Sequence, residues 1–149
     1  MGKATSDGTL RTALASNGQR YTAQRASVFR FLRSTDSHPT ADEVFFHVRQ
    51  EVPGISLATV YKSLETLVGC GLATKLTYGD GSARYDGRTD EHHHLRCLGC
   101  RRVIDLPGRV DHREVARLEA SADGFHVTGY RLELTGYCGA CAPGAANPA

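Results

Sequence analysis

Residues 56–86 read SLATVYKSLETLVGCGLATKLTYGDGSARYD, and this stretch decides the fold. It begins with Ser56, a residue type that caps helices, and apolar residues then recur at helical spacing as far as the Gly-Cys-Gly sequence at 69–71. Alternating apolar and polar residues follow over 72–78 and 82–85, on either side of a turn-forming Gly-Asp-Gly-Ser sequence. The pattern predicts a helix followed by a β-hairpin.

Helices are also predicted upstream of this stretch. Thr22 has the sequence context of an N-cap, and the helix that it opens ends near Arg33. Thr40 and Glu43 form a capping box at the start of the next helix. Three helices followed by a hairpin are the outline of a winged helix-turn-helix domain. A shorter helix over residues 9–16 is expected to precede them, after a loose N-terminal tail.

The pattern changes after Tyr85, where short strands and a single helix are predicted. Strands are expected over residues 95–97, 103–106 and 127–137, and a helix over residues 111–122 that turns Val115 and Leu118 inward. Three short strands and one helix bury little apolar surface alone. We therefore expect a small α/β domain whose strands also pair across a dimer.

The predicted fold class is α+β, with an N-terminal winged helix-turn-helix domain and a small C-terminal α/β dimerisation domain. The expected boundaries are 1–85 for the first domain, 86–90 for a hinge and 91–149 for the second. With 149 residues, 40% of them hydrophobic and 23% charged, the chain can bury a core, which argues against disorder. No stretch has the length and apolarity of a membrane span or a signal peptide, so a soluble, cytoplasmic protein is expected.

Charges and metal-binding residue types are unevenly distributed along the chain. The net charge of +2 is too small to identify a nucleic-acid-binding protein, but the first 35 residues hold six basic side chains against one acidic. The N-terminal part is therefore the better candidate for binding phosphate groups. Four of the five cysteines and five of the seven histidines lie after Tyr85, so the second part is rich in metal ligands.

Two C-x2-C motifs stand 37 residues apart, as Cys97-Leu-Gly-Cys100 and Cys138-Gly-Ala-Cys141. Each offers two thiolates on a tight turn, and together they form the closed tetrahedral sulfur site that Zn²⁺ prefers. Disulfides are disfavoured in an intracellular chain, and a redox C-x-x-C motif needs no matched second copy. We predict a structural zinc ion with no open coordination position.

A second group of possible ligands flanks the first cysteine motif. Asp86 precedes the run His92-His93-His94, and Asp105 follows the motif. On an extended segment His92 and His94 point to one face, while His93 points to the other. Nitrogen and oxygen ligands favour Fe²⁺ or Mn²⁺, although zinc also fits such a site. A solvated polar loop is the alternative interpretation of three adjacent histidines.

The order of these motifs resembles the ferric uptake regulator family. The matching segments are Arg20-Tyr-Thr-Ala-Gln-Arg25, His38-Pro-Thr-Ala-Asp-Glu43, Thr59-Val-Tyr-Lys-Ser-Leu64, Arg84-Tyr-Asp86, the histidine run and both cysteine motifs. The resemblance covers nearly the whole chain, from about residue 10 to residue 141. It implies a homodimeric, metal-activated repressor with a winged-helix domain that binds double-stranded DNA, and not an enzyme.

The resemblance also implies the identity of the ligands. It places the structural zinc on Cys97, Cys100, Cys138 and Cys141, and a regulatory Fe²⁺ or Mn²⁺ on His38, Asp86, His92, His94 and Asp105. Iron-uptake members of the family usually have glutamates at the positions of Asp86 and Asp105, whereas the peroxide-sensing branch has aspartates. In this respect the sequence resembles the peroxide-sensing branch. In that branch, peroxide that reaches Fe²⁺ leads to oxidation of His38 or His92, which weakens metal binding and releases DNA. A further metal site found in some members is not expected, because Tyr130 stands where its histidine would be.

The predicted helix that begins at Ser56, the third helix of the winged helix-turn-helix domain, is expected to enter the major groove of an AT-rich palindromic operator. Its predicted DNA-contacting residues are Thr59, Tyr61 and Lys62. Tyr61 suits a thymine methyl group, and Lys62 suits a guanine edge or a phosphate. Arg20 resembles the basic residue that enters a narrow minor groove in this family. Lys75 and Arg84 of the hairpin are expected to contact the DNA backbone.

Several other functions have to be compared with a peroxide-sensing repressor. A repressor of iron, manganese or zinc uptake would have the same fold and would respond to metal availability only. A zinc hydrolase or deaminase would need an open zinc and a glutamate in an H-x-E arrangement. Glu91 instead precedes the histidines, and the four cysteines close their zinc. A thiol oxidoreductase is the third alternative, and zinc that stays bound under mild oxidation would argue against it.

Overall fold

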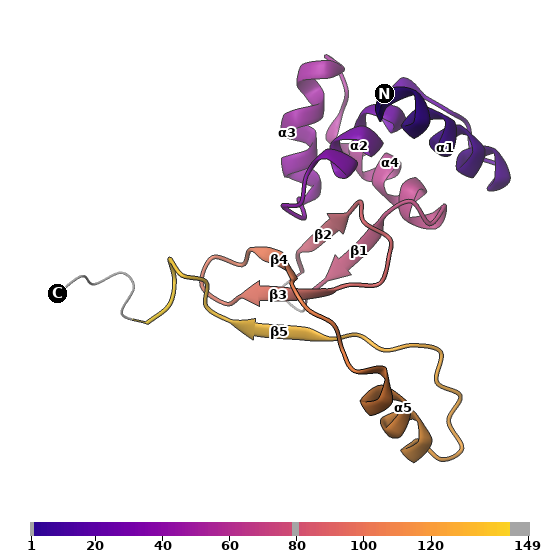
Figure 1. The fold of residues 1–149 in the computed structure, drawn as a ribbon. Helices are drawn as coiled ribbons and strands as arrows, with labels where there is room; N and C mark the ends of the chain where they lie inside the picture. The colour runs from indigo at the N-terminus through magenta and orange to yellow at the C-terminus, as the bar shows by residue number, and fades with distance from the viewer. Residues whose placement is uncertain (1, 79–80, 144–149) are drawn as a thin grey trace. The chain divides into compact units, whose positions relative to one another are not determined.

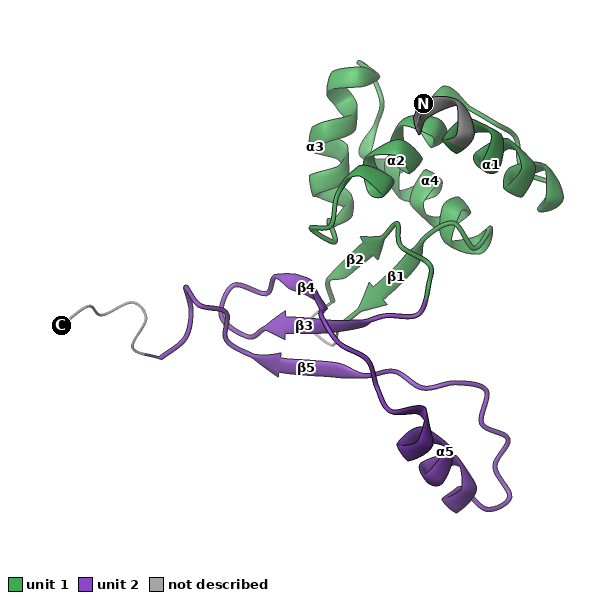
Figure 2. Cartoon of the chain, viewed as in Figure 1, with its two compact units in different colours: residues 1–90 green, residues 91–149 purple. Residues whose placement is uncertain are grey.

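The structure, a computed structural model, describes residues 2–78 and 81–143, with side chains from residue 6 onward. The chain forms two compact units, Met1–Asp90 and Glu91–Ala149 (Figures 1 and 2). Part of the predicted hairpin turn, at residues 79–80, and residues 144–149 lie outside the described residues. Within the described residues, no helix has both the length and the apolar composition needed to cross a bilayer.

In its described residues, the first unit contains four helices and a hairpin, and the caps in the sequence predict three of these helices. The elements are α1 Gly2–Ser16, α2 Ala23–Ser34, α3 Ala41–Glu51, α4 Leu57–Gly69, β1 Thr74–Thr77 and β2 Ala83–Asp86. Thr22, Thr40 and Ser56 each accept a hydrogen bond from a backbone N–H in the first turn of the following helix, and both bonds of the capping box at Thr40 are present. Strands β1 and β2 are antiparallel.

Helix α1 is longer than predicted, because residues expected to form a loose tail are helical. Its Leu10 and Leu14 are fully buried against the core of the first unit. Asp7 accepts a hydrogen bond from the Tyr21 hydroxyl at 3.0 Å and lies 3.5 Å from the Arg30 guanidinium. These contacts with other elements stabilise a helix start whose sequence has no cap or acidic first turn of its own.

The core of the first unit lies between the helices and one face of the hairpin. Helix α2 packs against both α3 and α4. The buried residues contributed by α4 and β2 are Val60, Leu64, Leu67 and Tyr85. Burial of these side chains fixes α4 from its inner face and leaves its outer face exposed.

The second unit is a three-stranded sheet with one helix. Its elements are β3 His93–Cys97, β4 Val103–Leu106, α5 His112–Ser121 and β5 Glu133–Gly136, in the strand order β4-β3-β5 (Figure 1). The prediction of a strand over 127–137 is therefore wrong at its start. Strand β5 pairs in parallel with β3, and the pairing begins with Glu133 opposite His94.

The second unit has almost no apolar core of its own. Among its described residues, the buried hydrophobic ones are Cys97 and Val103. Leu118, expected to point inward, is 71% exposed, and Phe125 is 76% exposed. The expectation for Leu118 is wrong for a single chain, because among the described residues of the second unit no helix or strand buries that face of α5. The stability of this unit must come from sources other than a buried core.

Candidate metal centres and recognition helix

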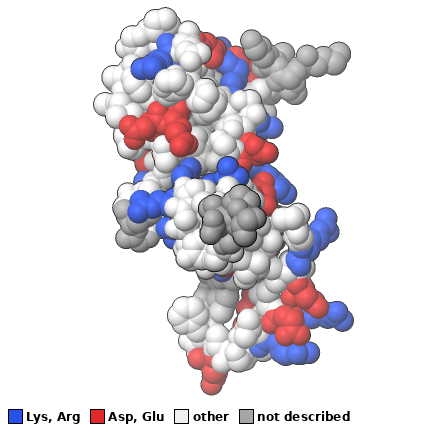
Figure 3. Space-filling model, turned by 90° about the vertical axis from the view of Figure 1, so that its left-hand side faces the viewer, with Lys and Arg blue, Asp and Glu red and all other residues white. Residues whose placement is uncertain are grey.

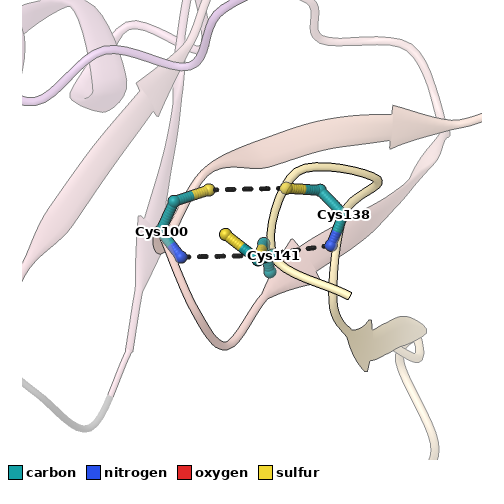
Figure 4. A group of neighbouring side chains, drawn as sticks. Cys100, Cys138 and Cys141 are labelled. Atoms are coloured by element: carbon teal, nitrogen blue, oxygen red, sulfur yellow. Dashed lines mark hydrogen bonds between the residues drawn. The ribbon is translucent and has the colours of Figure 1, made fainter. Parts of the chain in front are cut away.

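The four cysteines of the two C-x2-C motifs lie together in the second unit. Because β3 and β5 are parallel neighbours, their ends are side by side, and each motif follows one strand end. The four Sγ atoms lie within 4.8 Å of one another. The sulfurs of Cys100 and Cys138 face each other at 3.8 Å (Figure 4). That is the separation of about 3.8 Å expected for a tetrahedron with Zn–S bonds of roughly 2.3 Å, whereas a disulfide needs about 2.05 Å.

Backbone N–H groups stabilise negative charge on this sulfur cluster. The N–H of Cys138 lies 3.3 Å and that of Cys100 lies 3.5 Å from Cys97 Sγ. These hydrogen bonds, with that of Cys138 contributing most, lower the pKa of Cys97 to about 6. The pKa of Cys138 is also lowered, chiefly by the Cys141 N–H, whereas the hydrogen bond that the Cys141 thiol donates to Cys138 raises the pKa of Cys141. One deprotonated thiol thus opposes ionisation of its neighbour, and a bound cation relieves that opposition.

Gly99 leaves the space that the two motifs need to approach each other. A Cβ at this position would lie 2.8 Å from Cys141 Cβ and 2.9 Å from its Sγ. A larger residue would therefore push the second motif away. The donor set, the sulfur spacing and the glycine together fit a closed Zn²⁺ site.

His38 and Asp86 form a buried pair in the first unit. Their side chains meet through Nε2 and Oδ2 at 3.2 Å, and the two residues are 2% and 6% exposed. His38 has a φ of +52°, in the left-handed region, between α2 and α3. The Arg84 guanidinium donates to its carbonyl at 3.0 Å, and the Tyr85 N–H donates to the Pro39 carbonyl at 2.9 Å. Strand β2 therefore holds the conformation of this loop.

His92, His94 and Asp105 form a second group, within the second unit. Nε2 of His92 lies 3.4 Å and Nε2 of His94 lies 3.7 Å from Asp105 Oδ1. The pairing of β3 with β4 explains this contact, because His94 is opposite Asp105 in the sheet. His94 is buried, and the side chain of His92 is largely covered, which does not fit a solvated loop. Each of the two groups offers only nitrogen and oxygen ligands.

His93 points away from this group, toward Tyr130. The two rings lie 5.7 Å apart, and the Tyr130 hydroxyl donates to Glu91 at 2.8 Å. This hydrogen bond to the carboxylate is the main cause of the raised pKa of Tyr130. Tyr130, which stands where some family members are expected to have a histidine ligand, is thus hydrogen-bonded to a carboxylate.

Helix α4 presents its predicted DNA-contacting residues unequally. Tyr61 and Lys62 are exposed, Tyr61 by 44%. Thr59 is half-buried, and its hydroxyl is engaged with the N-cap hydroxyl of Ser56 at 2.9 Å. Arg20 is exposed in the segment before α2. On the face in Figure 3, basic and acidic side chains are interspersed, so the charge on this face does not identify a DNA-binding surface.

The two basic residues of the hairpin have partners within the first unit. Arg84 contacts the His38 carbonyl and lies 3.8 Å from Glu43, with its side chain only 15% exposed. Lys75 pairs with Glu65 of α4 at 2.8 Å. Both side chains are engaged within the first unit, and their contact with the DNA backbone stays a prediction. Sequence reasoning missed these contacts because the partners are 10 and 46 residues away.

Comparison with known proteins identifies relatives of this chain in both sequence and fold. Residues 16–135 match the ferric uptake regulator family. The chain is 37% identical over 131 residues to the peroxide-responsive repressor PerR of Staphylococcus saprophyticus, with 87% of each protein covered. The ferric uptake regulator Fur of Helicobacter pylori superimposes with a TM-score of 0.79 at 20% identity, over 95% of this chain and 94% of that one. A zinc-bound manganese uptake regulator superimposes with a TM-score of 0.66 at 30% identity, over 87% and 98%.

These similarities extend over both units, and they confirm the predicted α+β fold with its winged-helix and dimerisation domains. The family match alone covers most of the described residues. The chain belongs to the ferric uptake regulator family.

Proposed function

We propose that the protein is a metal-dependent, DNA-binding repressor that senses peroxide through iron-catalysed oxidation of its regulatory site. The observation that carries the proposal is that each unit contains an incomplete set of nitrogen and oxygen ligands. The first unit offers His38 and Asp86, and the second offers His92, His94 and Asp105. Neither set alone satisfies an octahedral ion, whereas the five together leave one position for a small molecule. An ion bound by both sets would fix the relative orientation of the two units.

The two sets of ligands favour different metal ions. Four sulfurs at tetrahedral spacing favour Zn²⁺ as a permanent structural ion. The histidine and aspartate set favours Fe²⁺ or Mn²⁺ as the regulatory ion. If bound there, Fe²⁺ would supply the redox chemistry that turns hydrogen peroxide into a strong oxidant, which Mn²⁺ would not readily do. The imidazole of His38 or His92 would gain one oxygen atom from the peroxide, whose other oxygen would leave as water, and the oxidised imidazole would be a weaker ligand.

Regulation of DNA binding follows from the position of the ligands. His38 and Asp86 belong to the unit that carries α4, the proposed recognition helix, with Tyr61 and Lys62 reaching base edges and Arg20 entering a minor groove. In a homodimer, the orientation of the units would set the spacing of two such helices on a palindromic operator. Metal binding and DNA binding then strengthen each other by the same factor.

A regulator of metal uptake is the second candidate. The likeness to a zinc-bound manganese uptake regulator at 30% identity favours it, and the same ligands would serve. The peroxide-sensing function is preferred because the 37% identical relative is named a peroxide-responsive repressor, and because residues 86 and 105 are aspartates. In either case the protein is a regulator and not an enzyme.

Peroxide is expected to release DNA only from the iron-loaded protein. Gel shifts with a duplex selected for binding in Mn²⁺ would be run with Fe²⁺ or Mn²⁺, before and after hydrogen peroxide. We expect release with Fe²⁺, retention with Mn²⁺, and one added oxygen on the peptide containing His38 or His92 by mass spectrometry. Release by chelator alone, with no response to peroxide and no added oxygen, would support the uptake regulator instead.

The exposed apolar face of the second unit is expected to be a dimer interface. Leu118 of α5 borders a groove that Val110, Val127 and Leu132 also line, and exposed apolar surfaces of this kind mark association sites. Leu118→Glu should raise the dimer dissociation constant by at least about tenfold, because it places a charge in the interface. Sedimentation equilibrium measures the effect. Phe46→Glu, at a 53% exposed residue of α3, is the control and should leave the dimer intact.

A further inference from the structure

Strand β2 connects the metal ligands of the first unit with the recognition helix. Side chains alternate along a strand, so Arg84 and Asp86 lie on one face and Tyr85 on the other. Arg84 and Asp86 contact His38, through its carbonyl and its imidazole. Tyr85 reaches in the opposite direction, into the core beside α4. A displacement of Asp86 therefore moves Tyr85 with it.

Tyr85 ends in a hydrogen-bonded chain on α4. Its ring is fully buried, and its hydroxyl donates to Glu65 Oε1 at 3.1 Å. The same oxygen accepts a hydrogen bond from Lys75 Nζ at 2.8 Å, which ties β1 to the same point. Glu65 lies one turn after Tyr61 on α4, so the two side chains share a face of the helix. The carboxylate is thus held at the part of α4 proposed to contact bases.

We propose that the Tyr85–Glu65 hydrogen bond is the positioning link that carries the state of the metal ligands on β2 to the recognition helix. The inference rests on the proposed function, in which His38 and Asp86 bind the regulatory ion. Tyr85 is buried and Glu65 is engaged with Tyr85 and Lys75, so both act through other groups. Apolar packing of the Tyr85 ring is not directional, whereas a hydrogen bond to a carboxylate fixes both distance and angle.

If the bond is this link, removing it should weaken the coupling between Mn²⁺ binding and operator binding while the protein stays folded. Tyr85→Phe keeps the buried ring and removes only the hydroxyl. The quantity to measure is the ratio of operator dissociation constants without and with Mn²⁺, by fluorescence anisotropy on the full-length protein with a duplex selected in Mn²⁺. We expect this ratio to fall about three- to tenfold in Tyr85→Phe, within a coupling of the usual 5- to 150-fold range. The dissociation constant without Mn²⁺ should stay within about twofold of that of the parent.

The chain contains a matched control for the loss of a tyrosine hydroxyl. The Tyr21 hydroxyl also donates to a carboxylate of the first unit at 3.0 Å, but its partner is Asp7 of α1 and not a residue of α4. Tyr21→Phe should keep the Mn²⁺ ratio of the parent. Glu65→Ala, at an exposed carboxylate, should reproduce the effect of Tyr85→Phe. The double variant Tyr85→Phe/Glu65→Ala should add no further loss, because both changes remove the same bond.

Two results would overturn the inference. One is a Tyr85→Phe protein with the Mn²⁺ ratio of the parent. The other is an equal weakening of DNA binding with and without Mn²⁺, which would make the bond purely structural. Failure of metal-dependent DNA binding, the part of the proposed function on which the inference rests, looks different, because the parent protein itself would then show no effect of Mn²⁺ on operator binding.

Discussion

Replacing Cys138 with serine is expected to remove the zinc and to unfold the second unit. The change deletes one of four sulfurs that lie within 4.8 Å of one another. A serine hydroxyl is a poor ligand for Zn²⁺ beside three thiolates. We expect bound zinc to fall from about one ion per chain to a small fraction of that, as measured by metal analysis after gel filtration.

The expected loss of stability is large because little else holds this unit together. Its buried hydrophobic residues, within the described part, are Cys97 and Val103, and Leu118 and Phe125 are exposed. Structural zinc contributes roughly 10–16 kcal/mol of apparent binding free energy in small zinc domains. Even about 3 kcal/mol would lower the Tm of a 60–100-residue domain by roughly 12–24 °C. Calorimetry should therefore show the transition of the second unit far below its position in the parent.

Cys70→Ser is the matched control for this experiment. Cys70 is half-buried at the end of α4 in the first unit, and it is not one of the four clustered cysteines. The control should retain zinc and the transition of the second unit. A Cys138→Ser protein that keeps its zinc and its Tm would contradict the assignment of the cluster as a structural metal site.

Local signals explain why the helices of the first unit could be predicted from the sequence. Thr22, Thr40 and Ser56 cap helices by hydrogen bonds to backbone N–H groups only three residues later. Such a cap can be recognised from the local sequence alone. The start of α1 has no such signal, and its stability depends on Asp7 meeting side chains 14 and 23 residues away. Sequence periodicity does not contain that information, so the helix was expected to begin at residue 9 instead of Gly2.

The same distinction applies to the candidate sites. Both cysteine motifs were identifiable because their spacing reflects the geometry of one tight turn each. The contacts of Arg84 and Lys75 were not, since a basic residue on a hairpin has the same sequence pattern whether it meets DNA or a carboxylate. The inward orientation expected for Leu118 was wrong because periodicity identifies an apolar face without saying whether the same chain covers it.

Replacing His38 with alanine is expected to abolish the increase in operator affinity that Mn²⁺ or Fe²⁺ produces. Loss of this imidazole leaves Asp86 as the ligand contributed by the first unit. An ion held by His92, His94 and Asp105 would then bind the second unit with little hold on the first. The ratio of operator dissociation constants without and with Mn²⁺ should fall from the usual 5- to 150-fold range to about one.

Strain at His38 has to be separated from loss of the ligand. The φ of +52° disfavours alanine, whereas glycine adopts this conformation without a steric penalty. His38→Gly should therefore lose the Mn²⁺ response to the same extent while unfolding at a higher temperature than His38→Ala. His47→Ala, at an exposed histidine stacked on Phe31 in the same unit, removes an imidazole that is not a proposed ligand and should keep the response. If His38→Gly folds and still binds the operator more tightly in Mn²⁺ by the parental factor, an ion shared by the two units is not what controls DNA binding.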